Sequence, residues 1–269
     1  MPSTRELKQS DPLVGLAPGA ELCMDAQQLV HGDGVQRAAL VERVRKACLA
    51  TGFFYADNAF TGDPVVANAL AQMQRFFSLP DDDPRKIAVD NRRKQGSYGW
   101  MPMFGEPAYQ PGTRAHVESF DCGLGGKPRW IKTLEGSNVW PDLPGFRDDI
   151  GALWDRLAAL AGSVLDVLAE AAGLDRGFLS SRCSTQELST LRLLHYPGGH
   201  SEDRLRDVGI AAHTDFECIS LILQTSPGLE LTDVHGQWYD APAHQDRVIV
   251  LLDDMLEREP GSVERRFQV

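Results

Sequence analysis

Positive charge is scarce in this sequence. Its 269 residues include 27 lysines and arginines against 38 aspartates and glutamates, which gives a formal net charge of -11 and a pI near 5.1. Nucleic acids and anionic membrane surfaces attract clusters of Lys and Arg. The composition therefore argues against either of them as a partner.

Long hydrophobic runs are also missing. No stretch approaches the roughly 18 uninterrupted apolar residues of a transmembrane helix, so we expect no membrane span. Residues 1–12 are polar and lack the apolar core of a signal peptide. Internal repeats and low-complexity tracts are absent, and the 42% hydrophobic content is enough for the core of one large domain.

Cysteines are few and show no pairing pattern. They are odd in number and widely scattered, and none lies in a CxxC or CxH spacing: Cys23, Cys48, Cys122, Cys183 and Cys218. This pattern does not indicate a disulfide framework or a zinc site. It indicates free thiols in a reducing compartment, and we expect a cytoplasmic protein.

Helical spacing of apolar residues predicts three helices in the first two thirds of the chain. The first covers 35–51 and stops at Gly52, and the second covers 65–79 after an Asp-Pro start signal. The third is a long amphipathic helix over 144–172, closed by Gly173. Short β-rich runs separated by turns then fill the rest of the chain, which favours an α+β fold with a double-sheet jelly roll.

The segment HTDFE, residues 213–217, carries the main chemical signal. We expect it at the end of an apolar strand, where His213 and Asp215 would point to the same face because side chains alternate with period two. One imidazole and one carboxylate are two thirds of the facial triad that holds non-haem Fe(II). Taken alone, the pattern is more often a polar strand end beside a turn than a metal site.

The segments around this motif resemble, in order, those of the Fe(II)/2-oxoglutarate-dependent oxygenases of the isopenicillin N synthase-like branch. The resemblance covers roughly residues 35 to 257. The segments that carry it are TGFFYADN (51–58), RFFSLP (75–80), SYGW (97–100), ESFDCG (118–123), LRLLHYPGG (191–199), CISLILQ (218–224), PGLEL (227–231), GQWYDAP (236–242) and VIVLLDDMLE (248–257).

The resemblance implies a fold, a site and a reaction. It implies a double-stranded β-helix (jelly roll) core over 188–269, preceded by an N-terminal mixed α/β region over 1–187 that includes the long packing helix. His213 and Asp215 would bind Fe(II), and Tyr196 would contact the co-substrate 2-oxoglutarate. With O2, the enzyme would hydroxylate, desaturate or cyclise a small organic molecule, and no catalytic residue beyond the metal ligands is indicated.

One departure from the family concerns the C-terminal end. The family's distal His ligand and its Arg-x-Ser motif, whose Arg pairs with 2-oxoglutarate, have no counterpart after Asp215, and the family's GDMLE segment is DDMLE here (253–257). We therefore expect a chain truncated before the distal His, with 258–269 irregular. Two alternatives stay open: a binding or regulatory protein on the same fold that has lost catalysis, and an oxidase of the same branch that does not use 2-oxoglutarate.

The other candidate residues are less specific. Tyr98, Trp100, Met103 and Phe104 suit either a substrate mouth or ordinary packing beneath a long loop. We do not expect a replacement ligand among the loop histidines, which are His200, His235 and His244. The third metal ligand, the substrate and the oligomeric state are not indicated by the sequence.

Overall fold

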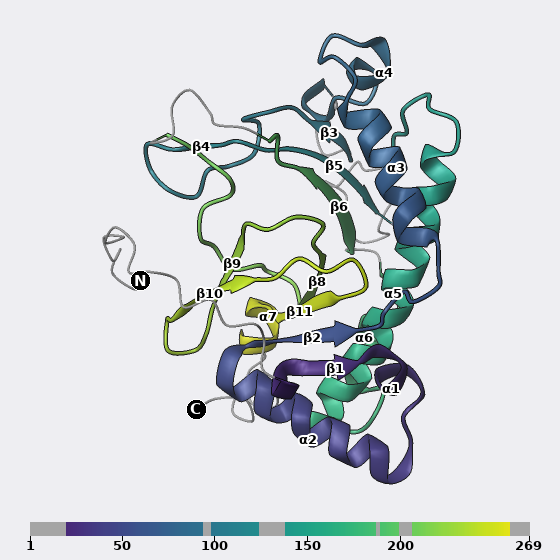
Figure 1. Ribbon diagram of the computed structural model, residues 1–269, viewed down its shortest axis with the longest axis vertical. Coiled ribbons are helices and arrows are strands. Elements are labelled where there is room, and N and C mark those ends of the chain that lie inside the picture. Colours follow the sequence, from purple (N-terminus) through teal and green to yellow (C-terminus); the bar gives the residue numbers. More distant parts are fainter. Residues whose placement is uncertain (1–19, 94–97, 124–137, 187–188, 199–205, 259–269) are drawn as a thin grey trace. The chain divides into compact units, whose positions relative to one another are not determined.

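The computed structural model describes residues 20–93, 98–123, 138–186, 189–198 and 206–258 (Figure 1). The helices are η1 (Ala20–Leu22), α1 (Ala26–His31), α2 (Gly34–Thr51), α3 (Val65–Phe77), α4 (Pro84–Ile87), η2 (Asn91–Arg93), α5 (Phe146–Ala171), α6 (Phe178–Arg182) and α7 (Asp254–Arg258). The strands are β1 (Cys23–Asp25), β2 (Phe53–Asp57), β3 (Gly99–Met101), β4 (Arg114–Ala115), β5 (Glu118–Gly123), β6 (Thr190–His195), β7 (Asp207–Val208), β8 (Ile219–Leu223), β9 (Leu229–Thr232), β10 (Trp238–Ala241) and β11 (Val248–Leu252).

These elements form two compact units, each built from discontinuous segments. The first unit comprises Met1–Gly62, Ala159–Arg182 and Asp215–Val269. The second unit comprises Asp63–Ala158 and Cys183–Thr214. The division of the chain at residue 187 that the sequence suggests stays a prediction.

A four-stranded sheet forms the centre of the first unit, in the order β1-β2-β11-β8 (Figure 1). β1 runs parallel to β2, and β11 pairs antiparallel with both β2 and β8. In this register Ile249 of β11 lies opposite Tyr55 of β2 and Ile222 of β8. Strands from the two ends of the chain thus share one sheet.

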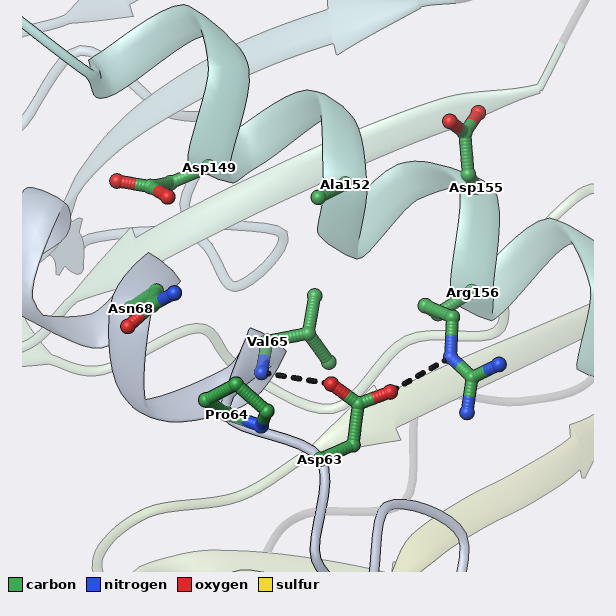
Figure 2. A pocket seen from close by; sticks show the side chains of 8 residues that line it. All are labelled: Asp63, Pro64, Val65, Asn68, Asp149, Ala152, Asp155 and Arg156. Carbon is green, nitrogen blue, oxygen red and sulfur yellow. Dashed lines mark hydrogen bonds and ion pairs between the residues drawn. The ribbon is translucent and has the colours of Figure 1, made fainter.

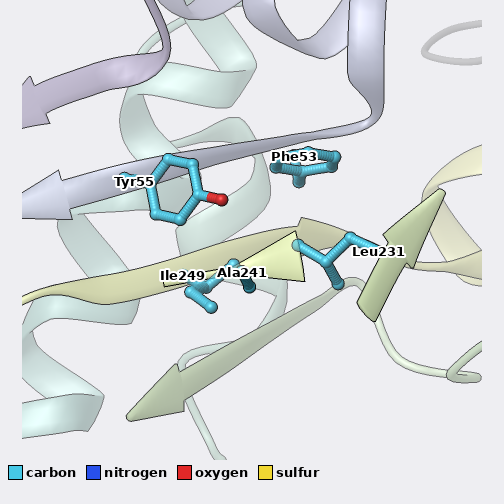
Figure 3. Packing of buried hydrophobic residues seen from close by; sticks show 5 residues of the cluster. All are labelled: Phe53, Tyr55, Leu231, Ala241 and Ile249. Carbon is cyan, nitrogen blue, oxygen red and sulfur yellow. The ribbon is translucent and has the colours of Figure 1, made fainter. Parts of the chain in front are cut away.

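The core of the first unit gathers on one face of this sheet (Figure 3). Phe53 and Tyr55, two residues apart on β2, contact edge to face, with ring centroids 5.9 Å apart. They pack with Ile249 and with side chains of the β9–β10 hairpin, Leu231 and Ala241. The residues of β2 that alternate with them are also buried, so this strand is covered on both faces.

Two helices, α2 and α5, end as the sequence predicts. α2 stops at Gly52, whose left-handed φ of 75° costs a residue without a Cβ little, and the Gly52 N–H donates to the Cys48 carbonyl. α5 ends before Gly173, at a φ of 69°. α5 is the long helix of the chain, and its 26 residues confirm the helix predicted over 144–172.

A three-stranded antiparallel sheet, β3-β5-β6, organises the second unit, beside a short parallel pair, β4-β7. Its core is aromatic, because Phe76 of α3 lies 5.3 Å from Phe120 of β5 and 5.4 Å from Phe146 of α5. α3 begins where Asp63 accepts a hydrogen bond from the Val65 N–H, as its Asp-Pro start signal predicts.

No helix in the described part of the chain is long and apolar enough to cross a membrane. The C-terminal segment for which we predict irregular structure lies, from residue 259 onward, outside the described residues.

Candidate metal centre

The HTDFE segment is irregular, so its predicted place on a strand is wrong. β8 begins only at Ile219, opposite Leu252, the last residue of β11. Since the partner strand ends there, residues 213–218 lie beyond the paired part of the sheet. The strand alternation that would point His213 and Asp215 to one face therefore does not apply to them.

Backbone donors at the start of α7 hold this segment in place instead. The N–H groups of Asp254 and Met255 donate to the carbonyls of Asp215 and Glu217, both at 3.1 Å. The first N–H groups of a helix have no partner within the helix. Here they fix the backbone that carries the candidate metal-binding carboxylate.

The Asp215 side chain is held by a hydroxyl. Ser220 Oγ lies 2.7 Å from Asp215 Oδ2 and 2.9 Å from Asp253 Oδ2. A hydroxyl has one proton to donate, so it cannot donate to both carboxylates at once. When Ser220 donates to Asp215, the second contact requires a protonated Asp253 that donates to Ser220 Oγ.

The surroundings of Asp253 favour its protonated form. The residue is only 5% exposed. Burial raises the pKa of its carboxyl to about 7, against a lowering by the Ser220 hydroxyl, and the negative charges of Asp215, Glu217 and Asp254 raise it further. Burial and the neighbouring charges thus both favour the protonated carboxyl.

His213 presents the nitrogen that a metal requires. Its Nδ1 lies 2.8 Å from the Ala211 carbonyl oxygen. A carbonyl oxygen only accepts, so Nδ1 carries a hydrogen. In the neutral ring, Nε2 then carries the lone pair with which imidazoles bind metals. The exposed ring also stacks on Tyr109, with centroids 4.7 Å apart and planes 9° from parallel.

These two donors suit Fe(II) in chemical type, since imidazole and carboxylate are the donors of the facial triad. His213 belongs to the second unit and Asp215 to the first. Within the described ranges, no group of three or more His, Cys, Asp or Glu side chains is arranged to hold a metal ion. His200 lies outside those ranges.

Tyr196 follows β6 directly and is 48% exposed. Burial of the rest of the side chain raises the pKa of its hydroxyl, as does the nearby Glu106 carboxylate, while Arg192 lowers it. Arg192, four residues earlier on β6, forms a bidentate pair with Asp121 at 2.8 and 2.9 Å and lies 3.6 Å from Glu106. Tyr196 thus lies beside a group of charged residues.

The residues predicted either to line a substrate mouth or to pack beneath a loop differ in their exposure. Trp100 is a packing residue, because it is 2% exposed and its Nε1 donates to Glu118 at 2.7 Å. Phe104 is 38% exposed and stacks on His116. His195 also bonds Glu118, through Nδ1 at 2.8 Å, so it belongs to the same buried network.

A hollow of about 370 Å³ lies in the second unit between the start of α3 and α5 (Figure 2). An ion pair between Asp63 and Arg156, 3.0 Å long, crosses its floor. None of the residues predicted for the metal site lines it. The lining residues are Asp63, Pro64, Val65, Asn68, Asp149, Ala152, Asp155 and Arg156.

Local sequence patterns do not predict that Ser220, Asp253 and Tyr109 contact the candidate site. Ser220 carries a weak signal, as the polar residue inside the apolar run ISLIL. Asp253 is the first acid after another apolar run. Tyr109 lies far from His213 in the sequence, and nothing local marks it as a neighbour of that ring.

Two family models match the chain. One is described as the N-terminal region of non-haem dioxygenases in morphine synthesis and matches residues 23–143. The other is the 2OG-Fe(II) oxygenase superfamily, which matches 188–267.

Relatives and solved structures agree with these models. A 2-oxoglutarate-Fe(II) type oxidoreductase of Emericella nidulans is 30% identical over 256 residues, which cover 90% of this chain and 72% of that protein. The 2-oxoglutarate-dependent dioxygenase citB of Monascus ruber is 31% identical over 81% of this chain and 69% of its own length. A full-length Neurospora crassa protein solved in complex with alpha-KG superposes with a TM-score of 0.75 at 24% identity, covering 88% of this chain and 74% of that one.

The fold and the matched models define a non-haem iron oxygenase on a double-stranded β-helix. The chain belongs to the 2OG-Fe(II) oxygenase superfamily. It is by family a dioxygenase with Fe(II) as its metal and 2-oxoglutarate as its co-substrate. The family, the α+β jelly-roll fold, the enzyme class and the cofactors predicted from the sequence are thereby confirmed.

Proposed function

We propose that His213 and Asp215 are protein ligands of the Fe(II), that Tyr196 contacts 2-oxoglutarate, and that the enzyme uses O2 to oxidise a small organic molecule. The observation that carries the proposal is the state of the His213 ring. The Ala211 carbonyl fixes its hydrogen on Nδ1, so Nε2 is the donor nitrogen.

The side chains have distinct tasks in this proposal. When bound, Fe(II) and 2-oxoglutarate together activate O2, and 2-oxoglutarate is converted to succinate and CO2 while the substrate is oxidised. His213 supplies a neutral nitrogen whose ring plane is restrained by Tyr109. Asp215 supplies a negative charge, and Ser220 orients its carboxylate.

Names of relatives support a small organic substrate. One relative, 29% identical, is the clavatol oxidase of Penicillium crustosum. Another solved structure is a full-length Neurospora crassa protein in complex with alpha-KG and thymine, at 24% identity and a TM-score of 0.67. These names describe small molecules for those proteins. They support the same substrate class here, with hydroxylation, desaturation or cyclisation as the outcome.

The cytoplasm is the compartment we propose. All five cysteines are free thiols in the structure, as a reducing environment favours. The net charge of -11 is consistent with our expectation that nucleic acid is not a partner.

Calorimetric titration with Mn(II), a redox-inert stand-in for Fe(II), tests the ligand assignment. We expect His213→Ala and Asp215→Ala each to weaken Mn(II) binding at least about tenfold, because each removes an atom that binds the metal, and even the loss of a group that only orients a ligand costs about 10- to 100-fold. His235→Ala, which removes an exposed loop imidazole, is the matched control. Succinate release from Fe(II) and 2-oxoglutarate should fall in parallel. Equal Mn(II) binding by His213→Ala and the unmodified chain would disprove the assignment.

A further inference from the structure

We propose that Ser220 and Asp253 form a hydrogen-bonded support that positions Asp215 for the metal. The inference rests on the proposed function, because it concerns the carboxylate assigned there as a ligand. Neither residue would touch the metal. Both are positioning residues, and they act in series: Asp253 orients the Ser220 hydroxyl, and that hydroxyl orients Asp215.

The geometry of the support is short and continuous. Ser220 Oγ lies within hydrogen-bonding distance of Asp215 Oδ2, at 2.7 Å, and of Asp253 Oδ2, at 2.9 Å. Because the hydroxyl has a single proton, both bonds form together only when one of the two carboxyl groups is protonated and donates to Ser220 Oγ. In the order we propose, the buried Asp253 is that group, and Ser220 donates to Asp215. A hydrogen bond to Oδ2 restricts the rotation of the Asp215 carboxylate.

Both supporting residues stand on rigid backbone. Ser220 lies on β8, opposite Leu251 of β11, and Asp253 follows the end of β11 directly. β11 is buried over its first three residues, with Val248 and Val250 fully inaccessible to solvent. Asp253 itself is 5% exposed, so its carboxyl cannot turn into water without moving this strand end. The register of two strands therefore sets where the Asp215 carboxylate lies.

The backbone of Asp215 is held by the same strand end. Its carbonyl accepts from the Asp254 N–H at 3.1 Å, one residue beyond Asp253. The main chain of the candidate ligand is thus bound to the start of α7, and its side chain is connected to the end of β11 through Ser220.

Mn(II) titration of single variants tests the support. We expect Ser220→Ala to weaken Mn(II) binding about tenfold, as the loss of a group that orients a ligand does in other metal sites. Ser220→Thr keeps the hydroxyl and should bind within about threefold of the unmodified chain, below the loss expected when that group is removed. Asp253→Asn keeps a donor toward Ser220 and should bind similarly, whereas Asp253→Ala removes the donor and should bind more weakly. Ser226→Ala, at an exposed serine, is the control.

Thermal unfolding of the metal-free variants separates positioning from folding. If Ser220→Ala proves unstable, the contrast between Asp253→Asn and Asp253→Ala decides the question. Unchanged Mn(II) affinity in Ser220→Ala, with binding lost in His213→Ala, would overturn the support and leave the ligands in place. Unchanged affinity in His213→Ala would instead overturn the proposed function.

Discussion

The two residues of the candidate metal site, His213 and Asp215, are held in different ways. His213 is exposed and depends on a carbonyl and an aromatic ring for its orientation. Asp215 is hydrogen-bonded to the partly buried Ser220, which also contacts Asp253 at the end of β11. Substitution of a neighbouring side chain can therefore change the orientation of His213. A change in the orientation of Asp215 would instead disturb the end of the sheet.

The protonated state of Asp253 predicts a pH dependence of stability in the metal-free protein. Its pKa is about 7 in the folded chain and near the ordinary value of 3.8 when unfolded. Between these values the folded state holds a proton that the unfolded state has released, so stability falls as pH rises from about 4 to 7 and then levels off. The groups facing this carboxyl are Ser220, Asp215, Glu217 and Asp254.

Thermal unfolding from pH 5 to 8 checks this prediction. Asp253→Asn cannot release a proton, so it should lose this part of the pH dependence and gain stability relative to the unmodified chain as pH rises toward 7. Parallel curves for the two proteins would show that Asp253 is charged in the folded state.

Tyr109 gives a second prediction at this scale. It stacks on His213 and has a left-handed φ of 47°, an unfavourable conformation for a bulky residue. Strained residues of this kind cluster at functional sites. An aromatic pair contributes about 0.5–1.5 kcal/mol, so Tyr109→Ala should weaken Mn(II) binding by a factor of about 2 to 10. Tyr109→Phe keeps the stack and should bind as the unmodified chain does. An equal loss of Mn(II) affinity in both variants would show that the Tyr109 hydroxyl, and not the ring stack, is responsible.

Among the secondary-structure elements, the five-residue helix α7 has a particular role in holding the candidate site. Its first N–H groups bind the carbonyls of the irregular segment that precedes β8. A short helix with few neighbouring turns is only marginally stable by itself. Its hydrogen bonds to Asp215 and Glu217 therefore stabilise the helix start and the candidate site together.

Asp254→Pro tests this arrangement. Proline is well tolerated at the first position of a helix, where it removes only the N–H, and here that N–H donates to the Asp215 carbonyl. We expect a loss of about 1 kcal/mol in unfolding free energy and weaker Mn(II) binding. Asp254→Asn removes the charge and keeps the N–H, so it separates the two effects. If both variants lose Mn(II) affinity equally, the charge of Asp254 is responsible.

At the scale of the whole molecule, the two units have cores of different chemistry. The first unit packs aliphatic and aromatic side chains against its sheet. The second unit encloses a charged network in which Lys86, 1% exposed, lies 3.0 Å from Glu118 and 4.8 Å from the centre of the Trp100 ring. A buried charge of this kind is stable only while its partners remain.

Lys86→Met should therefore destabilise the protein by about 3–5 kcal/mol, because it leaves the buried Glu118 carboxylate without its cation. Denaturant unfolding followed by far-UV circular dichroism measures this. Lys46→Met is the matched control, since Lys46 is 74% exposed in a helical pair with Glu42, and surface pairs contribute about 0–1 kcal/mol. Comparable losses of unfolding free energy in both variants would mean that the buried network stabilises the protein no more than a surface ion pair does.

Features that depend on neighbours along the chain could be predicted from the sequence. Apolar spacing and a following glycine locate α2 and α5, since helical periodicity and a left-handed stop are local properties. The order of short motifs identified the family, and the HTD pattern marked the candidate ligands within it.

How the candidate ligands are held depends on contacts that form only in the folded chain. The loss of strand geometry at residues 213–218 follows from where β11 ends, which is a property of strand pairing rather than of the segment itself. Ser220 meets Asp253, and His213 meets Tyr109, across long stretches of sequence. A hydrogen bond or a ring stack needs positions fixed within a fraction of an ångström, and the packed sheets supply that constraint where sequence spacing does not.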